Sequence, residues 1–152
     1  MWLRNARRVP TVVRTPAHVW LTVRMAAWSL VLPVLKRLLP LPRLARLMWS
    51  DGRGHSSGED HERVVTLARW ICSARVGRGR DNCLDRAFLT YRFLAMASAN
   101  PRLVVGMRSG ERVAGHAWVT LNGRTVHGAG ESPDDFVAVV AFGRGGAREE
   151  PA

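Results

Sequence analysis

Two side chains in this sequence could together perform nucleophilic catalysis: the thiol of Cys83 and the imidazole of His116. A cysteine attacks as its thiolate, which forms most readily at a helix N-terminus, where unpaired N–H groups and the helix dipole stabilise negative charge. Cys83 follows Asp81-Asn82, and asparagine is a typical N-cap residue. The same N–H groups could hold the oxyanion of an acyl transfer, so this spacing indicates a cysteine nucleophile.

A thiol nucleophile needs a base within hydrogen-bond reach, and His116 lies in the segment GHAWVTL, which alternates as a strand does. The apolar side chains of that strand define its buried side: Ala117, Val119 and Leu121. His116 and Trp118 are then expected to face a cleft, or the helix that carries Cys83. A strand histidine is more often structural than catalytic when it stands alone, so the surrounding elements decide its interpretation.

The other cysteine, Cys72, lies inside an apolar helical stripe beside Ile71 and is interpreted as structural. Together the two cysteines form no CxxC, no zinc-ligand pattern and no disulfide framework of the secreted kind. The sequence therefore predicts a reduced, cytoplasmic compartment.

Hydrophobic periodicity predicts the elements that position these residues. Apolar residues recur at three- and four-residue steps over 59–74 and again from Cys83 to the stop at Asn100-Pro101, which indicates two helices. The Val-rich segment that follows alternates and contains the turn signals Ser109-Gly110 and Asn122-Gly123, which predicts three antiparallel strands. The expected fold class is α+β, with N-terminal helices followed by a small antiparallel sheet.

The basic residues are concentrated at the N-terminus: residues 1–50 hold nine Lys and Arg and no Asp or Glu, in a chain of net charge +11. Residues 17–32 read as an amphipathic helix that Pro33 ends or kinks. Charges and prolines interrupt this region too often for a membrane span or a signal peptide. The expected organisation is a basic helical extension over 1–50, a linker over 51–60, the catalytic domain over 61–142 and a disordered tail over 143–152.

Three ordered motifs add a resemblance: C-L-x-R-A at 83–87, V-V-G-M-R at 104–108 and H-A-W-V at 116–119. Over roughly residues 60–142 the chain resembles the papain-related, transglutaminase-like cysteine peptidases that remove leader peptides in lasso-peptide biosynthesis. The resemblance implies that Cys83 attacks the bond ending the leader, that His116 takes the thiol proton, and that water hydrolyses the acyl-enzyme. It further implies that the reaction needs no metal and no cofactor. It also implies three partners: a lasso precursor peptide, a small leader-binding recognition protein and the macrolactam cyclase.

The third catalytic position departs from the family, which usually has an acidic residue on the strand after the hairpin, where this chain reads TVHGAG. A three-residue loop at 121–123 would place His116 opposite Gly128, and a two-residue turn at 122–123 would place it opposite Ala129. Glu131 is the candidate third residue, and the site works as a dyad if Glu131 does not reach back. Further neighbours that could approach are His127, Asp134 and Asp135.

Two other functions stay open at this point. One is a non-catalytic scaffold of the same fold, which measured peptide cleavage would exclude. The other is a membrane-surface or nucleic-acid protein, because tryptophans stand beside arginines in residues 1–50. Docking of this block on a protein partner is the simpler account, so nucleic acid is not expected and a membrane surface is not favoured.

Overall fold

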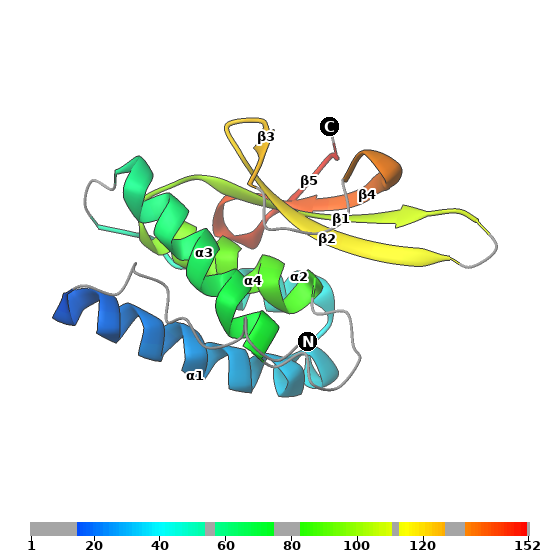
Figure 1. Cartoon of the computed structure of the whole chain (residues 1–152). Helices are drawn as coiled ribbons and strands as arrows, with labels where there is room; N and C mark the ends of the chain where they lie inside the picture. Colours follow the sequence, from blue (N-terminus) through cyan, green and yellow to red (C-terminus); the bar gives the residue numbers. More distant parts are fainter. Residues whose placement is uncertain (1–14, 54–56, 75–82, 111–112, 127–132, 152) are drawn as a thin grey trace, which may run out of the picture.

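The computed structural model describes residues 15–53, 57–74, 83–110, 113–126 and 133–151. Four helices come first: α1 (Pro16–Leu38), α2 (Leu41–Met48), α3 (Gly58–Ala74) and α4 (Cys83–Met96). The strands are β1 (Pro101–Arg108), β2 (Ala114–Leu121), β3 (Arg124–Thr125), β4 (Val137–Phe142) and β5 (Arg148–Glu149), with 3₁₀ turns η1 (Pro133–Asp135) and η2 (Arg144–Gly146). They form one antiparallel sheet in the order β3-β2-β1-β4-β5, and the helices cover one of its sides (Figure 1). The predicted α+β class is confirmed.

The hairpin between β2 and β3 turns at Asn122-Gly123, as its sequence predicts. Both residues have positive φ, 52° and 76°, which the two-residue type I′ turn requires and which Asn and Gly adopt most easily. Thr120 pairs with Thr125 on either side of the turn. The two-residue register is therefore the one that forms, rather than the three-residue loop.

Helix α4 is the centre of the core, because it contacts the other three helices as well as β1 and β2. Most of its residues are buried, including the almost fully buried Phe88, Leu89, Tyr91, Phe93 and Leu94. Cys83 is its first residue. Helix α4 is thus the most enclosed helix of the described structure.

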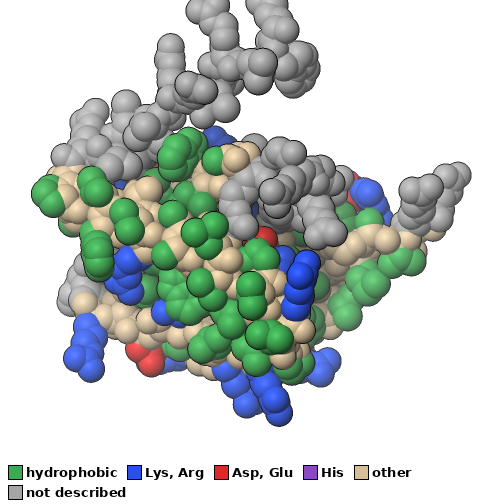
Figure 2. Space-filling view, turned by 90° about the horizontal axis from the view of Figure 1, so that it is seen from below, with side chains coloured by type: hydrophobic (Ala, Val, Ile, Leu, Met, Phe, Trp, Pro, Cys, Tyr) green, Lys and Arg blue, Asp and Glu red, His purple; other side chains and the backbone are tan. Residues whose placement is uncertain are grey.

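Helices α1 and α2 belong to the same core as α4, although their segment is predicted as an extension. Met25 and Leu32 of α1 and Leu44 and Met48 of α2 are at most 1% exposed and join the cluster that α4 organises. The predicted boundary at 51–60 therefore does not separate two cores. The other side of α1 is exposed to solvent, and Figure 2 views the molecule from that side.

Helix α1 also continues through Pro33, so of the two outcomes that the sequence predicts there, an end or a kink, the end does not occur. A proline inside a helix removes one backbone hydrogen bond. Contacts on both sides of it hold the last turn, since Leu32 is fully buried and Lys36 forms an ion pair with Asp85 of α4. Tertiary packing thus outweighs the local preference of the proline.

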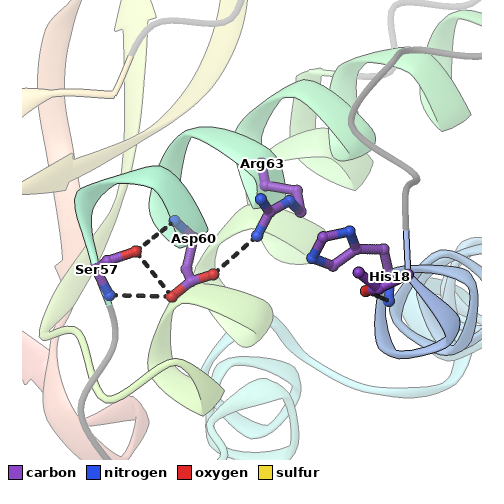
Figure 3. Close-up of polar contacts among 5 residues, drawn as sticks. His18, Ser57, Asp60 and Arg63 are labelled. Carbon is purple, nitrogen blue, oxygen red and sulfur yellow. Dashed lines mark hydrogen bonds and ion pairs between the residues drawn. The ribbon is translucent and has the colours of Figure 1, made fainter.

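Helix α3 begins at Gly58, inside the predicted linker, because Ser57 and Asp60 form a capping box. The N–H of Asp60 donates to Ser57 Oγ at 3.3 Å, and the N–H of Ser57 donates to Asp60 Oδ2 at 3.0 Å. Arg63 donates to the other carboxylate oxygen at 2.8 Å, with His18 of α1 beside it (Figure 3). The backbone hydrogen bond from Ser57 is the main cause that holds the pKa of Asp60 below its ordinary value.

Residues 143–150, predicted as part of a disordered tail, instead form η2 and β5 at the edge of the sheet. The Tyr91 hydroxyl donates to the Gly143 carbonyl oxygen at 2.5 Å, and Arg102 pairs with Glu149 at 2.6 Å. Gly146 has a φ of 69°, and a Cβ there would lie 2.4 Å from the backbone of Arg46 in α2. The segment is held by backbone and polar contacts, which its low apolar content does not reveal.

Arg92 of α4 joins three helices. Its guanidinium lies 4.0 Å from the ring centroid of Trp28 in α1. It also donates to the carbonyl oxygens of Leu47 at 3.1 Å and Met48 at 3.4 Å, at the end of α2. The last carbonyls of a helix have no partner within that helix, so Arg92 supplies the missing donor.

We expect Arg92→Leu to lower the free energy of unfolding by about 2 kcal/mol, because the cation–π contact and two charge-assisted hydrogen bonds are lost. Urea denaturation measures this change. Arg69→Leu is the matched control, since Arg69 is exposed on α3 and surface substitutions usually stay within about 0.5 kcal/mol. Equal losses in the two variants would contradict a joining role for Arg92.

Candidate active site

Cys83 lies where the sequence predicts it, at the start of a helix. It is the first residue of α4, and 8% of its surface is exposed. The N–H groups of a first helical turn have no partners within the helix, so a thiolate here would be stabilised by them and by the helix dipole. The predicted N-cap, Asn82, lies outside the described residues. Cys72 is buried inside α3, where the sequence places a structural cysteine.

Cys83 and His116 lie toward the same end of the domain. A left-handed residue, Ser98 (φ 57°), closes the C-terminus of α4 and reverses the chain into β1. From its end back to Cys83, α4 extends about 20 Å, and β1 covers about 17 Å from Pro101 to Gly106. His116 pairs opposite Gly106, and α4 contacts both β1 and β2. The thiol and the imidazole are therefore at similar heights along the helix and the sheet.

The imidazole of His116 is enclosed by aromatic side chains. Its ring is stacked with Phe136, with centroids 4.9 Å apart, and with Trp118 at 6.0 Å, and the residue is 7% exposed. The guanidinium of Arg108 lies 5.0 Å from the Phe136 ring centroid. Nδ1 of His116 is buried and has no hydrogen-bond partner in the part of the chain that the structure describes. Such a nitrogen is costly to bury without a partner.

Alternation along β2 assigns its side chains to two faces. Ala117 and Val119 belong to the core cluster that contains Cys83, as the apolar pattern predicts. His116 and Trp118 point to the opposite side of the strand. The imidazole therefore does not project into the apolar core between α4 and the sheet.

Gly106 connects two of the sequence motifs, V-V-G-M-R at 104–108 and H-A-W-V at 116–119, because Trp118 of the second packs on Gly106 of the first. A Cβ at this position would lie 2.7 Å from a ring carbon of Trp118 and 2.8 Å from the Val137 carbonyl oxygen. The bare glycine lets the indole lie across β1, beside a register shift between β1 and β4. This packing fixes the position of the Trp118 indole, which stacks on His116. The signal in the sequence was a glycine inside a Val-rich strand, which often marks a close approach.

An ion pair between helices lies two residues after Cys83. Nζ of Lys36 in α1 contacts Oδ1 of Asp85, whose side chain is 8% exposed, against 29% for Lys36. A carboxylate in the first turn of α4 is also favoured by the helix dipole. Asp85 is the unspecified position of C-L-x-R-A, and sequence reasoning did not single it out. The pair means that α1 helps to fix the start of the site helix.

We expect Lys36→Met to lower the free energy of unfolding by about 2 kcal/mol, because it leaves the Asp85 carboxylate buried and unpaired. The loss should be smaller than the 3–5 kcal/mol typical of a fully buried pair, since Lys36 is partly exposed. Chemical denaturation measures it. The double variant Lys36→Met/Asp85→Leu should recover most of the stability, and a double variant no more stable than Lys36→Met would refute the pairing.

The candidate third residue, Glu131, lies outside the described residues, as do His127, Gly128 and Ala129. In the two-residue register of the hairpin, Ala129 is the residue expected opposite His116. Asp134 and Asp135 are exposed in η1, just before the Phe136 ring that stacks on the imidazole. Among the residues whose structure is described, no three His, Cys, Asp or Glu side chains gather as metal ligands would.

Comparison with known proteins assigns the domain to a broad superfamily, whereas the three sequence motifs point to one group of peptidases. A family model described as the transglutaminase-like superfamily matches residues 19–141. The matched range contains Cys83 and His116, and it begins inside α1, so it includes the helices predicted as an extension. No curated protein and no solved structure matches the chain significantly.

Proposed function

Since this chain belongs to the transglutaminase-like superfamily, we propose that it is a cysteine peptidase with Cys83 as nucleophile and His116 as base. The observation that carries the proposal is the position of Cys83 at the first residue of α4, at the end of the domain where β2 carries His116. The thiolate attacks the peptide carbonyl carbon while N–H groups of the first turn stabilise the oxyanion. His116 passes the thiol proton to the leaving amine, and water then hydrolyses the acyl-enzyme.

The proposed substrate is the leader peptide of a lasso precursor, and the three ordered motifs at 83–87, 104–108 and 116–119 support this narrower assignment. The proposed partners are a leader-binding recognition protein that presents the precursor and a macrolactam cyclase that uses the released amino terminus. The proposed location is the cytoplasm, where the Cys83 thiol stays reduced. The proposed chemistry uses no metal ion or cofactor.

The direct test is cleavage of a precursor peptide by the purified full chain together with the leader-binding protein. Mass spectrometry should detect two products that meet at the end of the leader, at a rate that saturates with precursor. If the protein cleaves unrelated peptides but not the precursor, it is a peptidase and the lasso assignment is wrong. An absence of cleavage with folded protein, over a range of precursors, would refute both.

A sharper prediction tests whether His116 acts on Cys83. If the two form a thiolate–imidazolium pair, Cys83 should be alkylated by iodoacetamide well below pH 8.5, the ordinary pKa of a cysteine thiol. His116→Ala should move the alkylation profile upward in pH, while His61→Ala on α3 serves as the matched histidine control. Peptide mass spectrometry separates labelling of Cys83 from that of Cys72. Identical profiles in the wild type and His116→Ala would rule out the pair.

A second candidate is a non-catalytic scaffold that uses the same fold to bind peptide. Two observations favour it: Cys83 is only 8% exposed, and His116 points to the side of β2 away from the core that contains Cys83. For a scaffold, the precursor should bind with the same affinity to Cys83→Ala and wild type, and neither protein should cleave it. Turnover by the wild type excludes this candidate.

A further inference from the structure

Helix α1 is apolar on both of its sides. Its inner side supplies Met25 and Leu32 to the core. Its outer side carries large apolar residues that are 46–71% exposed, and we call six of them the outer stripe of α1: Trp20, Val23, Leu30, Val31, Val34 and Leu38. Val19, which is 51% exposed, lies beside this stripe. At 100° per residue these six lie within about 100° of arc, opposite Met25, and the stripe runs about 27 Å along the helix.

An exposed apolar surface of this size is expected to be covered by a binding partner or a membrane. Exposed apolar residues on soluble proteins are normally scattered singly, whereas a continuous patch marks an interaction site. Although the sequence argues against a membrane span, α1 has the length and the composition of a helix that could cross a membrane, and most of it is not buried in the protein. Figure 2 shows hydrophobic side chains spread over this side of the molecule, with Lys and Arg among and around them and few acidic groups.

The charged residues of α1 and α2 themselves have one sign. Residues 15–50 contain five basic residues and no acidic ones. Three of them, Arg37, Arg43 and Arg46, are exposed at the end of α1 and on α2, next to the Leu38 end of the stripe. A basic margin around an apolar strip is complementary to anionic headgroups above acyl chains.

The chemistry of the stripe favours lipid over a protein partner. Protein interfaces contain about one hydrogen bond per 100–200 Å², so side chains that donate or accept are expected within them. Of the six residues of the stripe, only Trp20 has a hydrogen-bonding side chain, and tryptophan is also the residue enriched where acyl chains meet headgroups. Acyl chains require no hydrogen bonds from the surface that covers them.

We propose that the outer stripe of α1 binds the surface of an anionic bilayer with the helix lying parallel to the membrane plane. The inner contacts argue for this orientation rather than a span. A spanning α1 would have to leave the core, exposing Met25 and Leu32 and breaking both the Lys36–Asp85 pair and the stacking of Arg92 on Trp28. Lying on the surface, α1 keeps all of these contacts.

Vesicle flotation of the full chain tests the proposal. The protein should float with phosphatidylcholine vesicles that contain phosphatidylglycerol and much less with pure phosphatidylcholine. The variant Trp20→Ser/Leu30→Ser/Leu38→Ser should reduce partitioning by about a hundredfold or more, from the apolar area it removes. Arg37→Gln/Arg43→Gln/Arg46→Gln should reduce it by about a hundredfold on anionic vesicles, at about fivefold for each arginine.

The matched control is Val113→Ser/Val137→Ser/Val139→Ser, which removes valines that are 70%, 74% and 50% exposed in the sheet region, away from α1. It should float like the wild type. Melting temperatures of all variants check that they are folded. Trp20 gives a second readout, because vesicles should shift the tryptophan fluorescence of the wild type to the blue more than that of Trp20→Phe.

Three results would overturn the proposal. The first is flotation that the stripe variant retains, or that the sheet control loses equally. The second is a dimer in sedimentation velocity that the stripe variant abolishes while neither protein binds vesicles, since the stripe would then cover a second copy. The third is protein that resists alkaline carbonate extraction from vesicles, which would indicate a spanning helix. The proposal is supported if the protein binds the phosphatidylglycerol vesicles and if both the stripe variant and the arginine variant weaken this binding.

Discussion

Cys83→Ala is expected to abolish peptide cleavage, with a loss of about ten-thousandfold or more in kcat. The large effect follows from covalent catalysis, because no acyl-enzyme can form once the sulfur is removed, and nucleophile deletions in comparable enzymes are of this order. Substrate binding should change little, since the thiol is only a small part of any peptide-binding surface. Single-turnover cleavage of the precursor, followed by mass spectrometry, measures the loss.

The matched control is Cys72→Ala. Cys72 is 5% exposed in the interior of α3, so its truncation should cost about 1 kcal/mol of folding stability and leave kcat unchanged. Melting temperatures of both variants show whether the fold is kept. If the two substitutions reduce activity equally in folded protein, Cys83 is not the nucleophile.

The second large effect concerns stability: Leu32→Ala in α1 is expected to lower the free energy of unfolding by about 3 kcal/mol. Leu32 is fully buried, and a Leu-to-Ala truncation in a core removes transfer free energy and leaves a cavity. Leu38→Ala is the control six residues later on the same helix. Leu38 is 71% exposed, so its truncation should stay within about 0.5 kcal/mol.

This comparison tests whether α1 is part of the domain or an extension of it. For the same reason, deletion of residues 1–50 is expected to unfold the protein, because it removes Met25, Leu32, Leu44 and Met48 from the core at once. Circular dichroism and urea unfolding measure the outcome. A truncated chain that melts cooperatively, at the temperature of the intact one, would show that α1 and α2 are dispensable.

Several features of the protein follow from local sequence. The start of α4 at Cys83, the strand character of GHAWVTL and the turn at Asn122-Gly123 all depend on neighbouring residues: helical periodicity, period-two alternation and the ease of positive φ. The α+β class is the sum of such local signals. These signals can be recognised in the sequence because the interactions that cause them involve residues only a few positions apart.

The remaining features depend on contacts between residues far apart in the chain. The passage of α1 through Pro33, the Lys36–Asp85 pair and the order in residues 143–150 all arise because a distant segment compensates a weak local signal. The capping box at Ser57 is local, but the serine- and glycine-rich composition around it is typical of a linker as well. Composition therefore does not reveal that α1 and α2 pack into the core or that residues 143–150 form η2 and β5.

For the site, the sequence by itself determined which residue types could react: a cysteine at a helix start and a histidine on a following strand. Only the tertiary structure decided how they are held, with Trp118 across Gly106 and Phe136 on the imidazole of His116. It also decided that the face of β2 with Ala117 and Val119, and not the face with His116, packs against α4. Alternation assigns residues to two faces, but which face meets α4 is settled by packing of the whole core.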